Sequence, residues 1–506
     1  MVSGVSVSAQ MVVKTDAGKV EGAVATSGVR EFLGVPYAAP PVGDLRWKAP
    51  QPVAGWKGAR DAKTFGHHCW QFTEYPDMVF RDAGPSEDCL TLNVWTPKDA
   101  KALPVMLWIH GGGFTGGASS EPRQDGQFLA KRGVVVVSMN YRLGMLGFLA
   151  SSELTAESGR KTSGNYGLMD QAAALAWVKR NIKEFGGDPD NITIFGESAG
   201  SFSVSALMAS PVSKGMIAKA IGESGAGFWS QSIPFGSLTD REAHDAALVT
   251  KGLGSAKTLP ELRATSADVL VKTAAFQDSR AFPPDIDGYF LPDTLAHLYA
   301  RGEQAHVPLL AGWNADEVRV QATHAKTLMT AARWNELAHV AWKDKADEFL
   351  KVYPASTDEE ALRSAGDYAS DKFIVFTTWR WLESHVATGD APTFRYRFDL
   401  VPPADKYHPA GTGAFHSDDI EYVFGTLDSR QQAVWRDVDR KMSDEIQQYW
   451  VNFAKTGDPN GAGLPQWPQY KPEDWMVMHL DQPSVAKKDD LRQRYLVLDS
   501  IWMKGH

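Results

Sequence analysis

A serine flanked by two glycines, in Gly196-Glu197-Ser198-Ala199-Gly200, has the spacing of a strand-to-helix turn that exposes a nucleophilic hydroxyl. Such a five-residue pattern also arises by chance, but a β-rich run at residues 191–195 precedes it and a small-residue helix is expected at residues 199–208. We therefore expect Ser198 to be a nucleophile. Residues 222–226 nearly repeat the pattern, but Ala226 replaces the last glycine, so Ser224 is expected to be a polar residue at a strand end.

A glycine-rich segment, His110-Gly111-Gly112-Gly113, follows an apolar run and precedes the serine motif. Lipases and esterases pair this segment with the serine turn, and its backbone N–H groups stabilise the negative oxygen of a tetrahedral intermediate. We expect the N–H groups of Gly112, Gly113 and Ala199 to form this oxyanion hole. A turn without chemistry is the alternative, whereas a phosphate-binding loop is excluded because no Gly-Lys-Ser/Thr follows. The two motifs in this order favour acyl transfer.

The elements that must position these groups alternate along the chain. Short apolar runs at residues 104–109, 133–140, 191–195, 218–221 and 308–312 are typical of buried parallel strands, and residues 167–185 have helical spacing. Strands that alternate with helices predict a mostly parallel sheet covered on both faces. We expect one catalytic domain over residues 11–506, with helical insertions at about 235–300 and 320–385, and a long helix at 435–455.

Composition excludes several classes of protein. The chain has 506 residues, 43% of them hydrophobic, and a formal net charge of −9, which disfavours general binding to nucleic acid. Its apolar runs are far shorter than the roughly 18 residues that a membrane-spanning helix needs. Two cysteines cannot build a zinc-finger array or an iron–sulfur cluster. Residues 1–10 contain Val7-Ser8-Ala9, which is compatible with the remnant of a secretory signal peptide or with an ordinary flexible terminus.

Several longer segments resemble the type B carboxylesterase family, which includes cholinesterases and some fungal lipases. The resemblance covers nearly the whole chain and rests on ordered matches at residues 32–38 (FLGVPYA), 40–47 (PPVGDLRW), 87–94 (EDCLTLNV), 140–142 (NYR), 165–167 (NYG), 185–189 (FGGDP) and 453–460 (FAKTGDPN). It implies an α/β-hydrolase fold with a large mixed, mostly parallel sheet and helical cap insertions. It also implies a serine carboxylesterase that hydrolyses small carboxylic esters through an acyl-enzyme and needs no metal or organic cofactor.

This fold requires the order serine, acid, histidine. Residues 413–425 (GAFHSDDIEYVFG) resemble the family's catalytic histidine loop, so His416 is the expected base. Glu317 closes an Asn-x-Asp-Glu pattern that carries the acid in the family; Asp316 is the second choice. The family usually has glycine after the acid, where this chain has Val318 and Arg319.

The resemblance also implies roles for residues around the triad. Ser224 and Glu197 are expected to contact the catalytic groups rather than the substrate, and His110 is expected to support the oxyanion loop through hydrogen bonds.

The sequence predicts the ester substrate less closely than the reaction. Phe114, Phe228 and Trp229 match positions near the family's acyl pocket, although core packing explains each of them as well. Trp70 lies beside the first cysteine rather than toward the end of the 69–89 loop, which disfavours a choline ester specialist. Arg319 would favour an anionic acyl group if it lined the pocket. A lipase-like enzyme and a polycarboxylate-ester hydrolase stay open, and so does the oligomeric state. A non-catalytic binding protein on this fold is disfavoured because serine, acid and histidine are all present.

Cys89 lies in the segment where the family has a disulfide cysteine, so a Cys69–Cys89 bridge is implied; two free thiols are the alternative. A loop of this size contributes roughly 3 kcal/mol in the chain-entropy estimate. A disulfide indicates an oxidising compartment, and together with the signal-like terminus it predicts a secreted or periplasmic protein.

Overall fold

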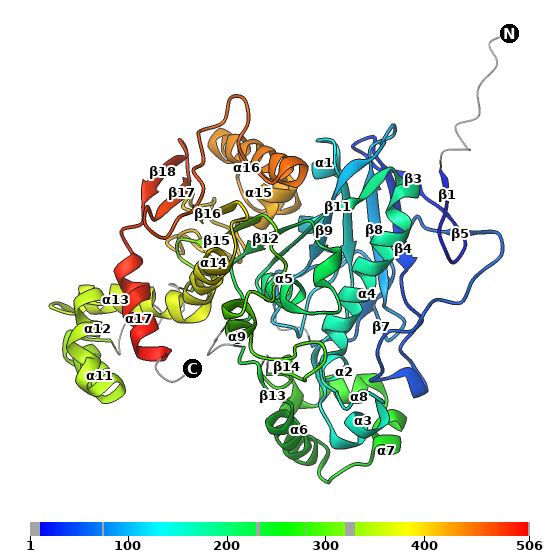
Figure 1. Ribbon diagram of the computed structural model, residues 1–506, viewed down its shortest axis with the longest axis horizontal. Coiled ribbons are helices and arrows are strands. Elements are labelled where there is room, and N and C mark those ends of the chain that lie inside the picture. Colours follow the sequence, from blue (N-terminus) through cyan, green and yellow to red (C-terminus); the bar gives the residue numbers. More distant parts are fainter. Residues whose placement is uncertain (1–10, 73–74, 229–232, 279, 319–328, 504–506) are drawn as a thin grey trace.

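An eleven-stranded mixed sheet organises the computed structural model, which describes residues 11–72, 75–228, 233–278, 280–318 and 329–503 (Figure 1). The strands lie in the order β18 (Val485–Lys488), β17 (Met476–Leu480), β16 (Thr393–Phe398), β15 (Leu309–Asn314), β12 (Lys219–Glu223), β11 (Gly187–Glu197), β9 (Leu103–Ile109), β10 (Val135–Met139), β8 (Thr91–Thr96), β4 (Arg30–Pro36) and β3 (Ala23–Val24). The seven strands from β17 to β10 run parallel, and antiparallel strands flank them on both sides. This is the large, mostly parallel sheet that the sequence predicts.

The central strands are buried on both faces, which explains their continuous apolar runs. In β9, Val105, Leu107 and Ile109 join one hydrophobic core, while Met106 and Trp108 join a second. Because successive side chains of a strand point to opposite faces, the two cores lie on opposite sides of the sheet. The sheet therefore lies between two cores, and the loops that follow its parallel strands lie at their carboxyl ends.

Helices cover both faces. Helices α4 (Tyr166–Asn181) and α5 (Ala199–Ala209) pack with the first core, and α1 (Gln127–Ala130), α15 (Ile420–Phe424) and α16 (Asp437–Thr456) with the second (Figure 1). Two helical segments lie in the regions expected as insertions. The first has α6 (Leu238–Leu253), α7 (Leu259–Ala264), α8 (Ala267–Lys272) and α9 (Leu295–Ala300); the second has α11 (Ala331–Trp342), α12 (Ala346–Val352), α13 (Asp358–Ser370), a π-helix (Asp371–Val375) and α14 (Phe376–Thr388).

The remaining elements are short. Helices α2 (Gly144–Phe148) and α3 (Ser152–Glu157) precede α4, and α17 (Arg492–Trp502) ends the described chain. Small sheets are formed by β1 (Val12–Lys14), β2 (Lys19–Glu21) and β5 (Ala59–Asp61), by β6 (His68–Cys69) and β7 (Pro85–Ser86), and by β13 (Gly236–Ser237) and β14 (Asp285–Ile286).

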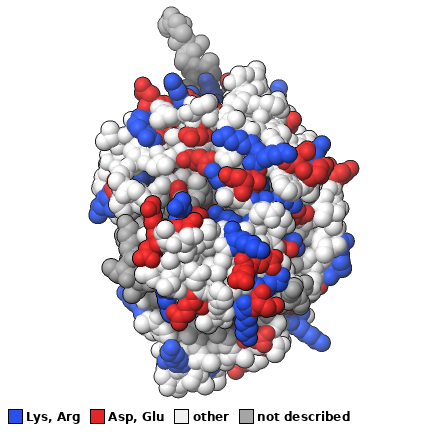
Figure 2. All heavy atoms as spheres, turned by 90° about the vertical axis from the view of Figure 1, so that its left-hand side faces the viewer, with Lys and Arg blue, Asp and Glu red and all other residues white. Residues whose placement is uncertain are grey.

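Charges of both signs are interleaved on the side where α11, α12 and α13 lie (Figure 2). This mixture agrees with the similar numbers of basic and acidic residues in the chain, 52 and 61. In the described part of the chain, no helix has an apolar stretch long enough to span a bilayer. Residues 1–10, with the signal-like Val7-Ser8-Ala9, lie outside the described residues.

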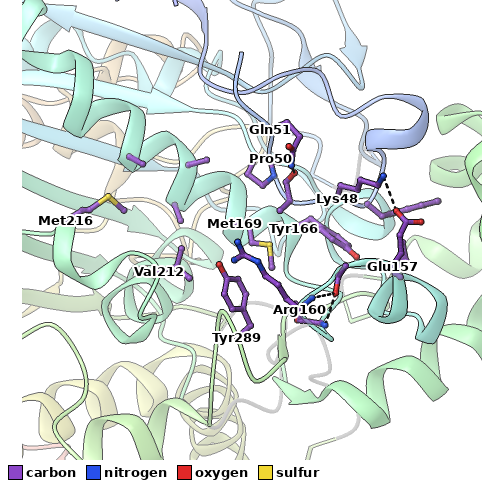
Figure 3. Close-up of a pocket in the computed structure, with 18 residues that line it drawn as sticks. Lys48, Pro50, Gln51, Glu157, Arg160, Tyr166, Met169, Val212, Met216 and Tyr289 are labelled. Carbon is purple, nitrogen blue, oxygen red and sulfur yellow. Dashed lines mark hydrogen bonds and ion pairs between the residues drawn. The ribbon is translucent and has the colours of Figure 1, made fainter. Parts of the chain in front are cut away.

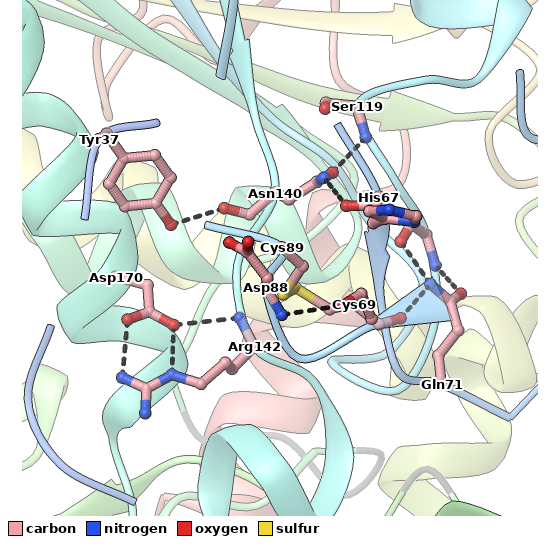
Figure 4. The surroundings of a disulfide bond; sticks show 12 residues. Tyr37, His67, Cys69, Gln71, Asp88, Cys89, Ser119, Asn140, Arg142 and Asp170 are labelled. Atoms are coloured by element: carbon pink, nitrogen blue, oxygen red, sulfur yellow. Dashed lines mark hydrogen bonds and ion pairs between the residues drawn. A yellow bond between two sulfur atoms is a disulfide. The ribbon is translucent and has the colours of Figure 1, made fainter. Parts of the chain in front are cut away.

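Cys69 and Cys89 form the expected disulfide (Figure 4). Two residues further on, the side chain of Gln71 exchanges two hydrogen bonds with the backbone of Gly117: its Nε2 donates to the carbonyl oxygen at 2.9 Å and its Oε1 accepts from the N–H at 2.8 Å. Asn140, at the end of β10, bridges the same region, because its side chain contacts the backbone of both His67 and Ser119. The bridge thus fixes a segment that supports the glycine-rich loop after β9.

Replacing both cysteines with serine should lower the free energy of unfolding by about 3 kcal/mol. A chain of this length unfolds with an entropy on the order of 1 kcal/mol per kelvin, so calorimetry should show a midpoint about 3 °C lower. Unreduced, denatured wild-type protein should show no free thiol. Two titratable thiols in that sample would contradict the bridge.

Candidate active site

Ser198 occupies the turn between β11 and α5. Its φ of 55° and ψ of −122° are unusual for a residue with a side chain, and such strain accompanies functional sites. The two glycines of the motif are sterically required: a Cβ at Gly196 would lie 2.6 Å from the carbonyl oxygen of Ile109, and one at Gly200 would lie only 2.0 Å from it. The motif therefore lets α5 and the end of β9 meet closely, which lifts Ser198 above the edge of the sheet.

The glycine-rich loop lies against this serine. A Cβ at Gly111 would come within 3.1 Å of the Ser198 Cβ and 2.6 Å of Glu197 Oε2. Gly112 and Gly113 have φ values of 102° and 62°, which glycine adopts readily. The N–H groups of Gly112, Gly113 and Ala199 have no acceptor among the described residues. Three amide donors without a described acceptor thus lie in the two segments that meet at Ser198.

His416 bonds to both other members of the expected triad. Its Nε2 lies 2.9 Å from Ser198 Oγ, and its Nδ1 lies 2.5 Å from Glu317 Oε2. Its own backbone N–H donates to the Glu317 carbonyl oxygen at 3.3 Å, so loop and acid hold each other. The ring of Phe373, on the π-helix, meets the imidazole edge to face at 4.9 Å. These contacts fix the orientation of the imidazole.

The carboxylate of Glu317 is fully buried just after β15. Its Oε1 accepts hydrogen bonds from Ser224 Oγ at 2.6 Å and from the Asn314 N–H at 2.8 Å, which leaves Oε2 for His416. Asp316 points elsewhere: its carboxylate accepts from the Ala414 N–H at 3.1 Å. The geometry therefore favours Glu317 over Asp316 as the partner of the histidine.

Glu197 is a second carboxylate on the same imidazole. Its Oε1 lies 3.2 Å from His416 Nε2 and accepts a hydrogen bond of 2.5 Å from Ser417 Oγ. Ser417 has a φ of 69°, in the left-handed region that residues other than glycine seldom adopt. Ser224 thus contacts Glu317, and Glu197 contacts His416.

The electrostatics follow from burial and these neighbours. Burial of the His416 ring disfavours its charged form, but the carboxylates of Glu197 and Glu317 outweigh burial and raise the pKa of His416 above its ordinary value. Burial raises the pKa of Glu197, against the attraction of His416. By contrast, burial lowers the pKa of His110 to about 4, which keeps that ring neutral.

His110 has a packing environment of its own. Its ring stacks on Tyr141 at 4.4 Å, and its Nδ1 lies 2.9 Å from the Gly111 carbonyl oxygen. A neutral, buried ring in this position holds the start of the glycine-rich loop.

The expected pocket aromatics are placed only in part. Phe114 is fully buried with its ring against Phe148, and Phe228 is buried against Tyr299. Their packing suits a core role, and lining of the acyl pocket stays a prediction. Trp229 and Arg319 lie outside the described residues.

Sequence patterns did not reveal several neighbours of the triad. Ser417 and Asp419 lie within the quoted histidine loop, but nothing in the pattern indicates that one reaches Glu197 or that the other bonds with Asn314 and Tyr396. Phe373 had no signal beyond its aromatic type. In the described residues, no group of three or more His, Cys, Asp or Glu side chains is arranged to hold a metal ion.

Comparisons with known proteins agree on one family. The model of the carboxylesterase family matches residues 9–497. The fumonisin B1 esterase of Sphingopyxis macrogoltabida is 37% identical over 488 residues, covering 91% of this chain and 85% of that protein. The para-nitrobenzyl esterase of Bacillus subtilis (strain 168) is 37% identical over 508 residues, covering 94% and 96%.

A solved structure of a PNB esterase superimposes with a TM-score of 0.82 at 34% identity, covering 97% of this chain and 99% of that one. The expected α/β-hydrolase fold is therefore confirmed.

Proposed function

This chain belongs to the carboxylesterase family and is a carboxylic ester hydrolase, and from that premise we propose that it acts through an acyl-enzyme formed on Ser198. The observation that carries the proposal is the unbroken line of hydrogen bonds from Ser198 through His416 to Glu317. A histidine oriented by a buried carboxylate can take the serine proton as the serine attacks.

In the first half of the reaction, Ser198 Oγ bonds to the ester carbonyl carbon and its proton passes to His416 Nε2. The tetrahedral intermediate collapses, the bond to the alcohol oxygen breaks, and His416 returns the proton to the leaving alcohol. In the second half, His416 takes a proton from water, which attacks the acyl carbon, and Ser198 Oγ leaves with that proton. Glu317 keeps the imidazole in the tautomer whose Nε2 accepts, and it stabilises the charged ring.

The oxyanion hole in this proposal consists of the N–H groups of Gly112, Gly113 and Ala199. Two observations support this assignment: these N–H groups donate to no acceptor among the described residues, and Gly111 lies against Ser198. Donors fixed in advance need no rearrangement when the negative oxygen forms, which makes them effective in a buried site.

Alcohol trapping tests the intermediate. A series of esters should share one acyl group, such as butyrate, and differ in the leaving alcohol. With added methanol, a common acyl-enzyme must partition to methyl butyrate and butyric acid in the same ratio for every ester. A ratio that changes with the leaving group would contradict the proposal.

The class of ester that the protein hydrolyses is a second proposal. The similar proteins carry names as different as fumonisin B1 esterase, cocaine esterase and bile salt-activated lipase. We propose small carboxylic esters as the substrate class, with lipid esters and polycarboxylate esters as the alternatives. Comparing kcat/KM for p-nitrophenyl acetate, p-nitrophenyl dodecanoate and a tricarboxylate ester separates the three.

Glu197→Gln should move the acid limb of the kcat/KM profile to lower pH by about one unit. His416 must be neutral to accept a proton, and the charge of Glu197 raises the pKa of His416; removing that charge lets the ring stay neutral in more acid solution. Ser417→Ala removes only the hydroxyl that holds Glu197, so it should move the limb the same way by less. Measured pH profiles for the three proteins check the order, and a limb that moves to higher pH in Glu197→Gln would contradict it.

The compartment is also a proposal. A disulfide is compatible with an extracellular or periplasmic location, and we propose that the protein is exported to one of them. Fractionation of producing cells, with the thiol state of each fraction, tests this.

A further inference from the structure

A cavity of about 540 Å³ runs along α4 and is also lined by residues before and after this helix (Figure 3). Its floor includes Met169, Ala173 and Ala176, which lie on one side of the helix because residues three and four positions apart are neighbours there. Val212 and Met216, which follow α5, line the end of the cavity that is apolar (Figure 3). We call this cavity the α4 groove. None of its lining residues belongs to the triad or contacts it.

The other end of the groove carries charge. The guanidinium of Arg160 lies over the ring of Tyr289 at 4.4 Å and forms no ion pair with another described residue. Lys48 also lines the groove, but it pairs with Glu157 at 3.2 Å. Glu157 is further held by Arg263 at 2.7 Å, outside the groove, and hydrogen bonds from Arg263 lower its pKa to about 2. Glu157 is therefore ionised and already paired with two cations, whereas Arg160 lines the groove without a described counter-charge.

Shape and charge together specify a class of ligand. A volume of 540 Å³ is within the roughly 300–1,000 Å³ of small-molecule sites. Small alanine side chains at 173 and 176 leave room beside α4 for an alkyl chain. Two lining cations against one lining carboxylate give the groove a net positive charge, in a protein whose total charge is −9.

We propose that the α4 groove binds an amphipathic carboxylate with a straight alkyl tail, such as a fatty acid. The carboxylate pairs with Arg160, which the Tyr289 ring holds in place, and the tail lies along Ala173 and Ala176 toward Met216. This site is separate from the ester-hydrolysing site, and its occupation does not depend on the chemistry of Ser198.

Calorimetric titration of the full chain with octanoate, decanoate and dodecanoate, below their micelle concentrations, tests the tail. Each added methylene should tighten binding by roughly two- to fourfold until the groove is full. Dodecyltrimethylammonium, which has the same tail and the opposite charge, should bind at least tenfold more weakly. Equal affinity for the two head groups would overturn the proposal.

Variants then locate the site. Arg160→Met keeps the bulk of the side chain and should weaken dodecanoate binding roughly three- to tenfold, and Ala173→Phe should abolish binding by filling the floor. Val434→Phe adds the same ring at a position that is 81% exposed and outside the groove, and it should bind like the wild type. Hydrolysis of p-nitrophenyl acetate should be unchanged in all three.

If Ala173→Phe does not fold, Val212→Asp provides the same test by placing a charge at the apolar end of the groove, where the tail would lie. Dodecanoate binding that survives the groove-blocking variants unchanged would place the ligand elsewhere and refute the proposal.

Discussion

Replacing Ser198 with alanine is expected to lower kcat for ester hydrolysis by at least about 10⁴-fold while the protein stays folded. The reason is chemical, since no other described hydroxyl hydrogen-bonds to His416 Nε2. Stability should change little, because the Ser198 side chain bonds only to His416 among the described residues and the turn itself is built by the flanking glycines. Initial rates with p-nitrophenyl butyrate and a thermal melt measure both quantities.

Ser224→Ala is the matched control. Ser224 lies in the near-repeat of the serine motif, but its hydroxyl donates to Glu317 rather than facing His416 Nε2. Glu317 would keep the Asn314 N–H, so we expect a loss of about tenfold or less in kcat. A Ser224→Ala variant as inactive as Ser198→Ala, or a fully active Ser198→Ala, would exchange the roles of the two serines.

Glu317→Gln is expected to lower kcat by about 10³- to 10⁴-fold, the size of effect that follows when the acid of a serine triad is neutralised. The glutamine oxygen can still accept from Ser224 and the Asn314 N–H, which turns the amide NH₂ group toward His416 Nδ1. That group donates, so the imidazole is driven to the tautomer with hydrogen on Nε2, which cannot accept the serine proton. The fold should survive, because the replacement has nearly the same shape.

Asp316→Asn tests the alternative acid with the same change of charge. Asp316 supports the backbone of the histidine loop at Ala414, and none of its described hydrogen bonds goes to the imidazole, so kcat should fall less than tenfold. A larger loss in Asp316→Asn than in Glu317→Gln would assign the acid to Asp316.

Local patterns predicted the central strands closely. The run expected at residues 104–109 is β9 (Leu103–Ile109), and the helix expected at 199–208 is α5 (Ala199–Ala209), because elements buried on both faces have continuous apolar sequences. Strand β16 was missed because Arg395 interrupts its apolar pattern. That arginine is buried only because Asp489 pairs with it at 2.6 Å and the Trp313 ring stacks on it, and both partners are distant in sequence.

The proposed triad was predicted from the family resemblance rather than from a local pattern. His416 lies 218 positions from Ser198 and 99 from Glu317, so no local spacing joins them. Individual side-chain contacts could not be predicted from the sequence. The contacts of Ser417 with Glu197, of Phe373 with His416 and of Gln71 with Gly117 each depend on the direction of one side chain in the folded protein. The α4 groove could not be predicted either, because segments distant in the sequence line it together with α4.

Covalent labelling tests the central claim most directly. A fluorophosphonate should add one phosphonyl group per chain, and loss of ester hydrolysis should parallel its addition. Peptide mass spectrometry should then place the adduct on Ser198, in the peptide that also contains Glu197 and Ala199. An adduct on Ser224 or another serine, or full activity in protein labelled at Ser198, would contradict a nucleophilic Ser198.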